Sequence, residues 1–416
     1  MTYGHFRYYW LALLTGVTGH QMLLQFTLHW QMFKLTGEPM DLALLGMAIA
    51  APALALNLLG GVLADRLEPK YLVAAAQGGS ATVVVLLAIS VLTGAVQSWH
   101  LLLAAVIIGA GQAVDQPSRA SVSPRLVRPE HIVNAVAMDS LVWNTVRVAG
   151  PVLAGIIIER VSIEASMFFS AATFYILACV VSLLKMRPRP PSRGQVIRQI
   201  GESLGYVRHH PVFLHVMLLT FCNSLFGMAY IGLMPVFAED VLHVGAEKIG
   251  WLLGASGVGA ILGTWMVGNL REGFPKGKMI LGGAVLYGVA LILFALAAGQ
   301  ELYRMSMALL FIVGVANSWY LVGGLSTIQQ LVPEQLRGRV MGLYGITWSL
   351  SPLSVSQAGI VADHFGAPVA VAAGAVVIVA SAGAIFAFSP EVRNLRMGVG
   401  IATGPATQPM VAPTKD

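Results

Sequence analysis

Four charged residues interrupt stretches that are otherwise apolar, and they are the first candidates for chemistry. Asp115 and Arg119 are four residues apart, so on a helix they share one face and can pair with each other or with the loop from Asp65 to Lys70. Asp139 and Arg147 are eight residues apart and also lie roughly on one face. A charge inside a membrane-spanning helix costs roughly 2.5–3.5 kcal/mol, so each of these residues is a functional candidate. We interpret Asp115 and Arg119 as an ion pair that steadies an inner gate, and Arg147 as an anchor for an anionic substrate group or a carboxylate.

Polar side chains also recur in the first apolar stretch. At spacings of three and four residues it carries Thr18, Gln21, Gln25 and His29. This spacing predicts one polar stripe, and because lipid disfavours such a stripe, it should face a cavity or another helix. His20 lies in the same stretch, and its imidazole either changes charge during a working cycle or is a hydrogen-bonded packing residue.

The second half of the chain offers different chemistry. Its apolar stretches contain neutral polar residues, including Asn223 and Asn317, and the acidic residue Asp363 lies at the edge of a stretch. If protons are used, we therefore expect the proton-binding group in the first half, at His20 first and at Asp139 second.

The composition indicates that lipid is the solvent for most of this chain. Hydrophobic residues make up 56% and charged residues 11% of the 416 positions. A soluble domain carries about 25% charged residues. An ordinary soluble enzyme is therefore excluded, and an all-α membrane protein is predicted.

About twelve membrane-spanning helices are predicted from the apolar stretches. They cover approximately residues 8–34, 41–64, 71–94, 100–122, 132–158, 165–185, 211–237, 249–270, 279–299, 304–331, 340–362 and 368–389. On the outer side this arrangement leaves only Lys34, Arg160, Lys248 and Arg304, and nearly all the other Lys and Arg residues fall on the inner side. Since basic residues favour the cytoplasmic side, both termini are predicted to be cytoplasmic.

The longest polar stretch divides the chain into two halves of six helices each. The predicted parts are a first bundle (1–186), a cytoplasmic linker (187–210), a second bundle (211–389) and a disordered cytoplasmic tail (390–416). The halves resemble each other, because a shift of 204 residues takes Pro129 to Pro333 and Gly155 to Gly359. Two such repeats around a central cavity are an architecture that permits alternating access.

A loop between the second and third predicted helices carries a family resemblance. The segment GGVLADRLEPK contains Gly61, Asp65, Arg66 and Lys70, and it resembles the signature loop of the major facilitator superfamily. The resemblance implies two bundles of six helices and a gate in which Asp65 meets the positive end of a neighbouring helix. Glu68 and Pro69 replace the glycine and the first basic residue of the family pattern.

Further segments resemble one branch of this superfamily. AVDQPSRASVSPRLVRPEHIVNA, GPVLAG, GYVRHHP and LVPEQLRGRVMGLYG are similar to the transmembrane secretion effectors, the branch of the enterobactin exporter and macrolide efflux proteins. GPVLAG, with Gly150, Pro151 and Gly155, resembles the motif of exporters in the superfamily, although Val146 and Ala154 replace two of its glycines. The resemblance implies a multi-pass protein of the bacterial inner membrane that exports diverse cargo.

These observations favour a carrier over other classes of membrane protein. We expect export of a small organic molecule, such as a drug-like compound, siderophore or metabolite, by alternating access and proton antiport. Proton-coupled uptake and uniport remain alternatives, and a receptor or channel is less favoured. No HExxH or GxSxG motif supports an intramembrane enzyme. The expected partners are the small-molecule substrate and membrane lipid, without nucleic acid, metal or cofactor, and the expected working unit is a monomer.

Overall fold

A computed structural model describes residues 4–187, 210–271, 273–332, 340–341, 344, 347 and 350–395. The first half contains α1 (Gly4–Met22), η1 (Leu23–Thr27), α2 (Leu28–Thr36), α3 (Pro39–Arg66), α4 (Pro69–Leu92), α5 (Ser98–Leu126), η2 (Pro129–His131), α6 (Ile132–Arg160) and α7 (Ile163–Leu183). The second half contains α9 (Pro211–Cys222), η3 (Asn223–Gly227), α10 (Ala229–Gly232), α11 (Met234–Val236), η4 (Phe237–Val241), α12 (Ala246–Gly268), α13 (Lys276–Ala298), α14 (Tyr303–Leu331), α16 (Pro352–Phe365), α17 (Ala367–Phe388) and α18 (Pro390–Arg393).

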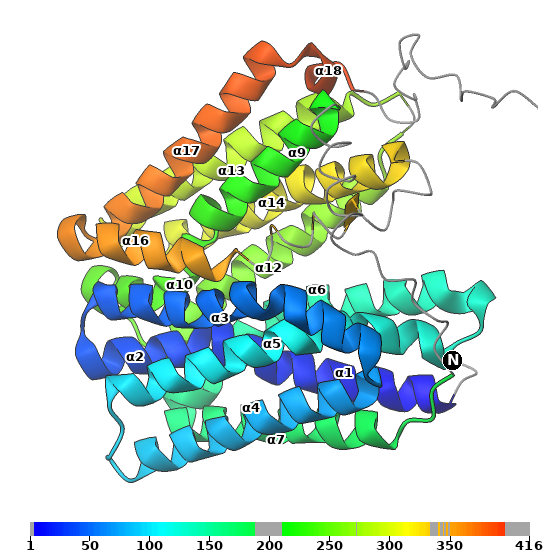
Figure 1. Cartoon of the computed structure of the whole chain (residues 1–416). Coiled ribbons are helices and arrows are strands. Elements are labelled where there is room, and N and C mark those ends of the chain that lie inside the picture. Colours follow the sequence, from blue (N-terminus) through cyan, green and yellow to red (C-terminus); the bar gives the residue numbers. More distant parts are fainter. Residues whose placement is uncertain are drawn as a thin grey trace, which may run out of the picture.

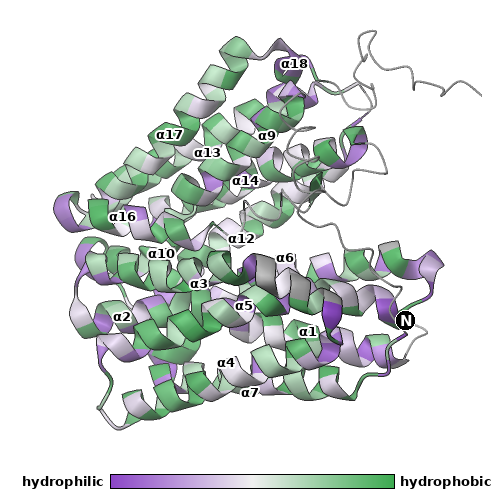
Figure 2. Cartoon of the chain, in the orientation of Figure 1, coloured by the Kyte–Doolittle hydropathy of each residue, from purple (hydrophilic) through white to green (hydrophobic). Residues whose placement is uncertain are grey.

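The helices are those of a membrane protein, and each apolar stretch that falls entirely within the described residues corresponds to one helix or one broken series of helices. Within the described residues, ten segments are long and apolar enough to cross a membrane. The first stretch is not among them; it carries the polar residues noted above and is interrupted by the π-helical turn η1. The described part of α16 has only 14 residues. Figure 2 shows hydrophobic residues along the helices and many of the hydrophilic residues near the bundle ends.

The helices form two bundles, one from each half of the chain (Figure 1). In the first, α1 packs on α6 and α7, and α4 packs on α5 and α7. In the second, α14 packs on α12 and α13, and α17 packs on α13. Residues 188–209 of the predicted linker lie outside the described residues. The bundles approach each other near α2 and α10, and they diverge toward the end that holds the N-terminus (Figure 1).

Glycines allow the two bundles to touch through their backbones. A Cβ added at Gly155 on α6 would lie 2.5 Å from the carbonyl oxygen of Ala246 on α12. A Cβ added at Gly359 on α16 would lie 2.7 Å from the carbonyl oxygen of Pro39 on α3. Because Gly155 and Gly359 are the pair related by the shift of 204 residues, the two cross-bundle contacts are equivalent halves of one pseudo-symmetric interface.

The start of the predicted disordered tail is ordered. Pro390 begins the short helix α18, and Val392 in this helix is fully buried. The Gly277 N–H at the start of α13 donates a hydrogen bond to the carbonyl oxygen of Leu395 (3.0 Å). The apolar Val392 side chain and this backbone bond explain why residues 390–395 pack on the second bundle. The rest of the tail lies outside the described residues.

Candidate functional site

Arg147 lies near the middle of α6, next to Val148, which contacts α12 of the second bundle. The helix packs on α12 from Gly155 to Val148, and a Cβ at Gly257 on α12 would lie 2.5 Å from the Val148 side chain. The Arg147 guanidinium lies within electrostatic range of the phenol groups of Tyr230, Tyr287 and Tyr344, all in the second bundle. The structure therefore places one guanidinium opposite several phenols at mid-depth, which is where the substrate sites of such two-bundle carriers lie.

Neutral polar groups surround these phenols. Tyr230 and Ser256 share a hydrogen bond between their hydroxyl groups (3.1 Å), and the Tyr287 hydroxyl donates to the carbonyl oxygen of Gly227 (2.8 Å). Tyr287 and Tyr320 pack edge to face with ring centres 5.7 Å apart. Since phenols combine an apolar ring with a polar tip, this wall suits a cargo that is partly aromatic.

The two asparagines predicted in the second half lie beside this phenol group. Asn317 on α14 is within hydrogen-bonding reach of the Tyr287 hydroxyl. Asn223 is fully buried in the π-helical turn η3, and among the described residues its amide makes no hydrogen bond. A π-helical turn often marks a functional position in a helix.

The first bundle holds a separate charged group. Asp115 and Arg119 form a buried ion pair on α5, one of the two pairings considered from the sequence. The Arg119 guanidinium lies over the ring of Trp143 on α6, 5.5 Å from its centre, and His20 packs edge-on against the same ring at 6.0 Å. Asp139 on α6 lies beside Ser123 on α5 and within electrostatic range of Arg119. His20, Asp115, Arg119 and Asp139 are thus brought together, whereas Arg147 lies apart from them and faces the other bundle.

The exporter-like motif has two contact faces. Gly150 faces α1, because a Cβ there would lie 2.8 Å from the Cβ of Gln21, which is buried. Pro151 and Gly155 face α12, where a Cβ at Gly250 would lie 2.9 Å from the Pro151 carbonyl oxygen and 3.4 Å from the Gly155 Cα. Gln25 lies partly buried in η1, which contacts α10. The motif therefore lies where α6 meets both its own bundle and the opposite one.

The segment with the family resemblance, at the end of α3 and the start of α4, is tied to its own bundle. Asp65 belongs to the last turn of α3, and its side chain lies outside the described part of the structure. Gly61 is in α3 with open space beside it, Arg66 is exposed, and the Lys70 ammonium lies 4.8 Å from the centre of the Tyr71 ring. Glu68, which replaces the family glycine, forms an ion pair with Arg125 at the end of α5 (3.1 Å).

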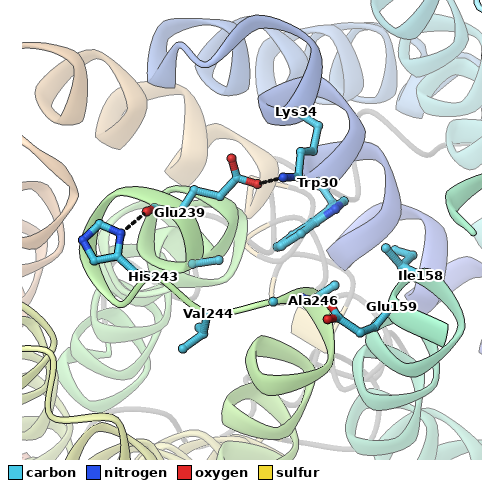
Figure 3. Close-up of a pocket in the computed structure, with 10 residues that line it drawn as sticks. Trp30, Lys34, Ile158, Glu159, Glu239, His243, Val244 and Ala246 are labelled. Atoms are coloured by element: carbon cyan, nitrogen blue, oxygen red, sulfur yellow. Dashed lines mark hydrogen bonds and ion pairs between the residues drawn. The ribbon is translucent and has the colours of Figure 1, made fainter.

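At the opposite end, ionic contacts join the two bundles around a pocket of about 630 Å³ (Figure 3). Lys34 on α2 forms an ion pair with Glu239 on η4. Glu159 on α6 accepts a hydrogen bond from the Ala246 N–H at the start of α12 (2.8 Å), and Arg160 makes a two-pronged bond to Glu247 (2.8 and 2.9 Å). We call these three contacts the outer latch, because the distribution of basic residues predicts that this end faces outward. From the sequence, Lys34 and Arg160 were assigned only to the outer side. Glu247, in the first turn of α12, was the residue that could have indicated a partner for such a basic side chain.

Comparisons with known proteins decide the family. The model of the transmembrane secretion effector family matches residues 1–401. The chain belongs to this family of major facilitator transporters. It is accordingly a multi-pass membrane transporter of a small molecule and not an enzyme, as predicted.

Relatives of this transporter include two proteins with named cargo. It is 27% identical to an uncharacterized MFS-type transporter, YfiS, of Bacillus subtilis over 81% of this chain and 82% of that protein. It is 22% identical to the staphyloferrin A transporter of Staphylococcus aureus (82% and 86%) and 24% identical to the enterobactin exporter EntS of Citrobacter koseri (69% and 68%).

Solved structures confirm the fold of the transporter. A bacterial homolog of the human lysosomal transporter Spinster, in an inward-facing and unoccupied conformation, matches with a TM-score of 0.76 and 15% identity. The match covers 93% of this chain and 97% of that one. The major facilitator fold predicted from the sequence is therefore confirmed.

The outer latch of the transporter yields a first prediction. Replacing Glu159 by alanine removes the acceptor for the first N–H of α12, a cap that is worth about 0.5–1 kcal/mol at an exposed site. The latched end should then open roughly two- to fivefold more often. The measurement is the labelling rate of a cysteine at Val152, which packs against Gly254 behind the latch. Glu164→Ala, at the start of α7 and outside the latch, is the control. Equal labelling of Glu159→Ala and the parent would contradict the role of the cap.

Proposed function

We propose that this transporter exports a small organic anion by alternating access and proton antiport, acting as a monomer. The observation that carries the proposal is Arg147 at mid-depth, between a closed outer latch and the divergent ends of the bundles. A binding group at that position is reached from one side only in each of two arrangements of the bundles, which is the requirement for alternating access.

The proposed direction is export, and the exporter-like motif and the relative that exports enterobactin support it. Basic residues predict that both termini are cytoplasmic. The end where the bundles diverge is the end that holds the N-terminus (Figure 1), so in this orientation the bundles diverge toward the cytoplasm. In this arrangement the cytoplasm has access to Arg147, a state through which exporters and importers both pass. During export, the cargo would leave after the outer latch opens. The exporter-like motif at Gly150, Pro151 and Gly155 agrees with this direction.

The cargo chemistry follows from the groups opposite each other at mid-depth. A guanidinium binds carboxylate or related anions through paired hydrogen bonds, and phenols stack on aromatic groups. We therefore propose a cargo with an acidic group and an aromatic or polar body. A siderophore fits this description and agrees with the relatives that handle enterobactin and staphyloferrin A; an acidic drug-like compound or metabolite fits as well.

The coupling ion is proposed from the first bundle. There His20, Asp115 and Asp139 are titratable groups that share one region with Arg119. Protonation of one of them changes the charge inside the first bundle, and this can bias the two arrangements differently. The neutral phenols of the second bundle, Tyr230, Tyr287 and Tyr320, would then contact the cargo.

The test is transport into inverted membrane vesicles, with enterobactin and staphyloferrin A as probes. With an acidic vesicle interior, we expect the probes to accumulate, and a protonophore should abolish the accumulation. If the probes accumulated only in right-side-out vesicles, the protein would be an uptake carrier and the proposed export would be wrong. If transport did not depend on the pH gradient, the protein would be a uniporter and the proposed proton antiport would be wrong.

A further inference from the structure

A second, smaller cavity lies inside the first bundle and away from the cross-bundle site. Its volume is about 10 Å³, and it is lined by polar side chains from three helices together with Phe174 of α7. The polar lining consists of His20 (α1), Gln77 and Ser80 (α4), and Gln112 and Asp115 (α5). A volume of roughly 10–15 Å³ accommodates one water molecule.

Several buried polar atoms at this cavity have no partner among the described residues. They are Gln77 Oε1, Gln112 Nε2 and Asp115 Oδ1. Gln77 is 6% exposed and Asp115 is 2% exposed, so bulk solvent does not satisfy them. The other carboxylate oxygen of Asp115 is already engaged by Arg119. A buried polar atom without a hydrogen bond costs about 1–3 kcal/mol, so these atoms together favour a ligand that both donates and accepts.

We propose that this cavity binds one water molecule, which links His20 to Asp115 as a proton-exchange pair. The role in proton exchange rests on the proton antiport proposed above, whereas the binding of water does not. Water matches the lining because it can donate to Asp115 Oδ1 and Gln77 Oε1 and accept from Gln112 Nε2. A sodium ion matches less well, because the Arg119 guanidinium already compensates the Asp115 carboxylate.

The exchange conserves atoms and charge. An imidazolium at His20 gives a proton to the water, and the water passes one of its own protons to Asp115 Oδ1. The pair then changes from imidazolium and carboxylate to neutral imidazole and carboxylic acid. Transfer through a single water is within the reach of general acid–base chemistry. Once Asp115 is neutral, Arg119 loses its charged partner on α5, and the remaining charged group near it is Asp139 of α6.

The charged and titratable groups facing this pair come from three helices. They are Tyr9 and His20 on α1, Asp115 and Arg119 on α5, and Asp139 on α6. Within the described residues, α4 and α7 contribute the neutral side chains Gln77, Ser80 and Phe174 to the cavity. Proton exchange at the cavity therefore changes the electrostatic attraction between Arg119 on α5 and Asp139 on α6. The helix α6 also carries Arg147 and contacts the second bundle.

Gly111 provides a substitution that fills the cavity without removing a titratable group. It lines the cavity, and a Cβ there would lie 3.2 Å from Ser80 Oγ. A valine at this position places its methyl groups where the water would bind. Gly79 on α4 is the matched control, because it is exposed and a Cβ there meets nothing within 4 Å.

Hydroxyl-radical footprinting of the full-length protein tests the water itself. Phe174 is 1% exposed, so radicals reach it only from a bound water. We expect oxidation of Phe174 in the parent and in Gly79→Val, and at least a severalfold loss in Gly111→Val. An unoxidised Phe174 in the parent, or equal oxidation in Gly111→Val, would overturn the proposed site.

Transport in vesicles tests the proton role, with enterobactin as the probe. Gln77→Leu removes an unpaired buried acceptor at similar size, so the fold should tolerate it. Both Gly111→Val and Gln77→Leu should lower pH-driven accumulation about tenfold while leaving exchange of probe for probe unchanged. If both variants accumulated the probe in response to pH as well as the parent does, the proton-exchange role of His20 and Asp115 would be refuted, whereas the water site would not. If the parent itself ignored the pH gradient, the proton antiport would fail and the footprinting result would still decide the water site.

Discussion

Arg147→Ala is expected to lower transport of an acidic cargo by about tenfold to a hundredfold, because a hydrogen bond to a charged group contributes about 1.5–3 kcal/mol. The guanidinium is the charged group that faces Tyr230, Tyr287 and Tyr344 across the interface. Arg147→Lys keeps the charge but loses the paired hydrogen bonds, so it should retain an intermediate rate. The measurement is initial uptake into inverted vesicles, compared at equal protein level.

Arg304→Ala is the control, since this arginine is exposed at the start of α14. It should transport at the parental rate. A neutral analogue of the cargo should also lose little in Arg147→Ala, because it offers no anion to the guanidinium. If Arg147→Ala transported acidic and neutral probes as well as the parent did, Arg147 would have no role in binding cargo.

Gly155→Val is expected to hold the outer end open and to reduce transport strongly. A Cβ at Gly155 would lie 2.5 Å from the Ala246 carbonyl oxygen and 3.2 Å from the Gly250 Cα, and neither backbone can move aside like a flexible side chain. Overpacking of this kind costs about 1–3 kcal/mol, which shifts the equilibrium about fivefold to a hundredfold toward the arrangement in which the bundles separate there.

The pseudo-symmetric position provides an independent check. Gly359→Val on α16 should have the same effect, because a Cβ there would lie 2.7 Å from the Pro39 carbonyl oxygen on α3. Gly282→Val on α13 is the control, since a Cβ at this exposed position meets nothing within 4 Å. Impermeant labelling of a cysteine at Val152 from the outer side should rise in both interface variants. Unchanged labelling with parental transport would show that the backbone contacts do not limit closure.

Hydropathy and the long polar stretch in the middle of the chain were sufficient to predict the helices and the two bundles, because both features depend on local composition. The repeat of 204 residues also pointed to the interface, since Gly155 and Gly359 occupy equivalent contacts in the structure. The spacing of Asp115 and Arg119 predicted their ion pair, because residues four apart meet on any helix.

Contacts between distant segments were not predictable in this way. The phenols of Tyr230, Tyr287 and Tyr344 come from three separate parts of the second half, and no spacing relates them to Arg147. Glu68 was read as a departure from the family pattern, whereas its ion pair with Arg125 depends on how α5 ends beside the loop. The position of His20 toward the interior of the first bundle likewise depends on packing against Trp143 and Phe174.

Distance measurements between spin labels test alternating access most directly. After replacement of Cys179 and Cys222, one pair of labels at Ser162 and Val244 would report on the outer end, and a second pair at Arg128 and Arg271 on the end that holds the N-terminus. As the transport cycle proceeds with cargo and a pH gradient in liposomes, the account predicts that the first distance lengthens while the second shortens. Two distances that stay constant, or that lengthen together, would contradict alternating access around Arg147.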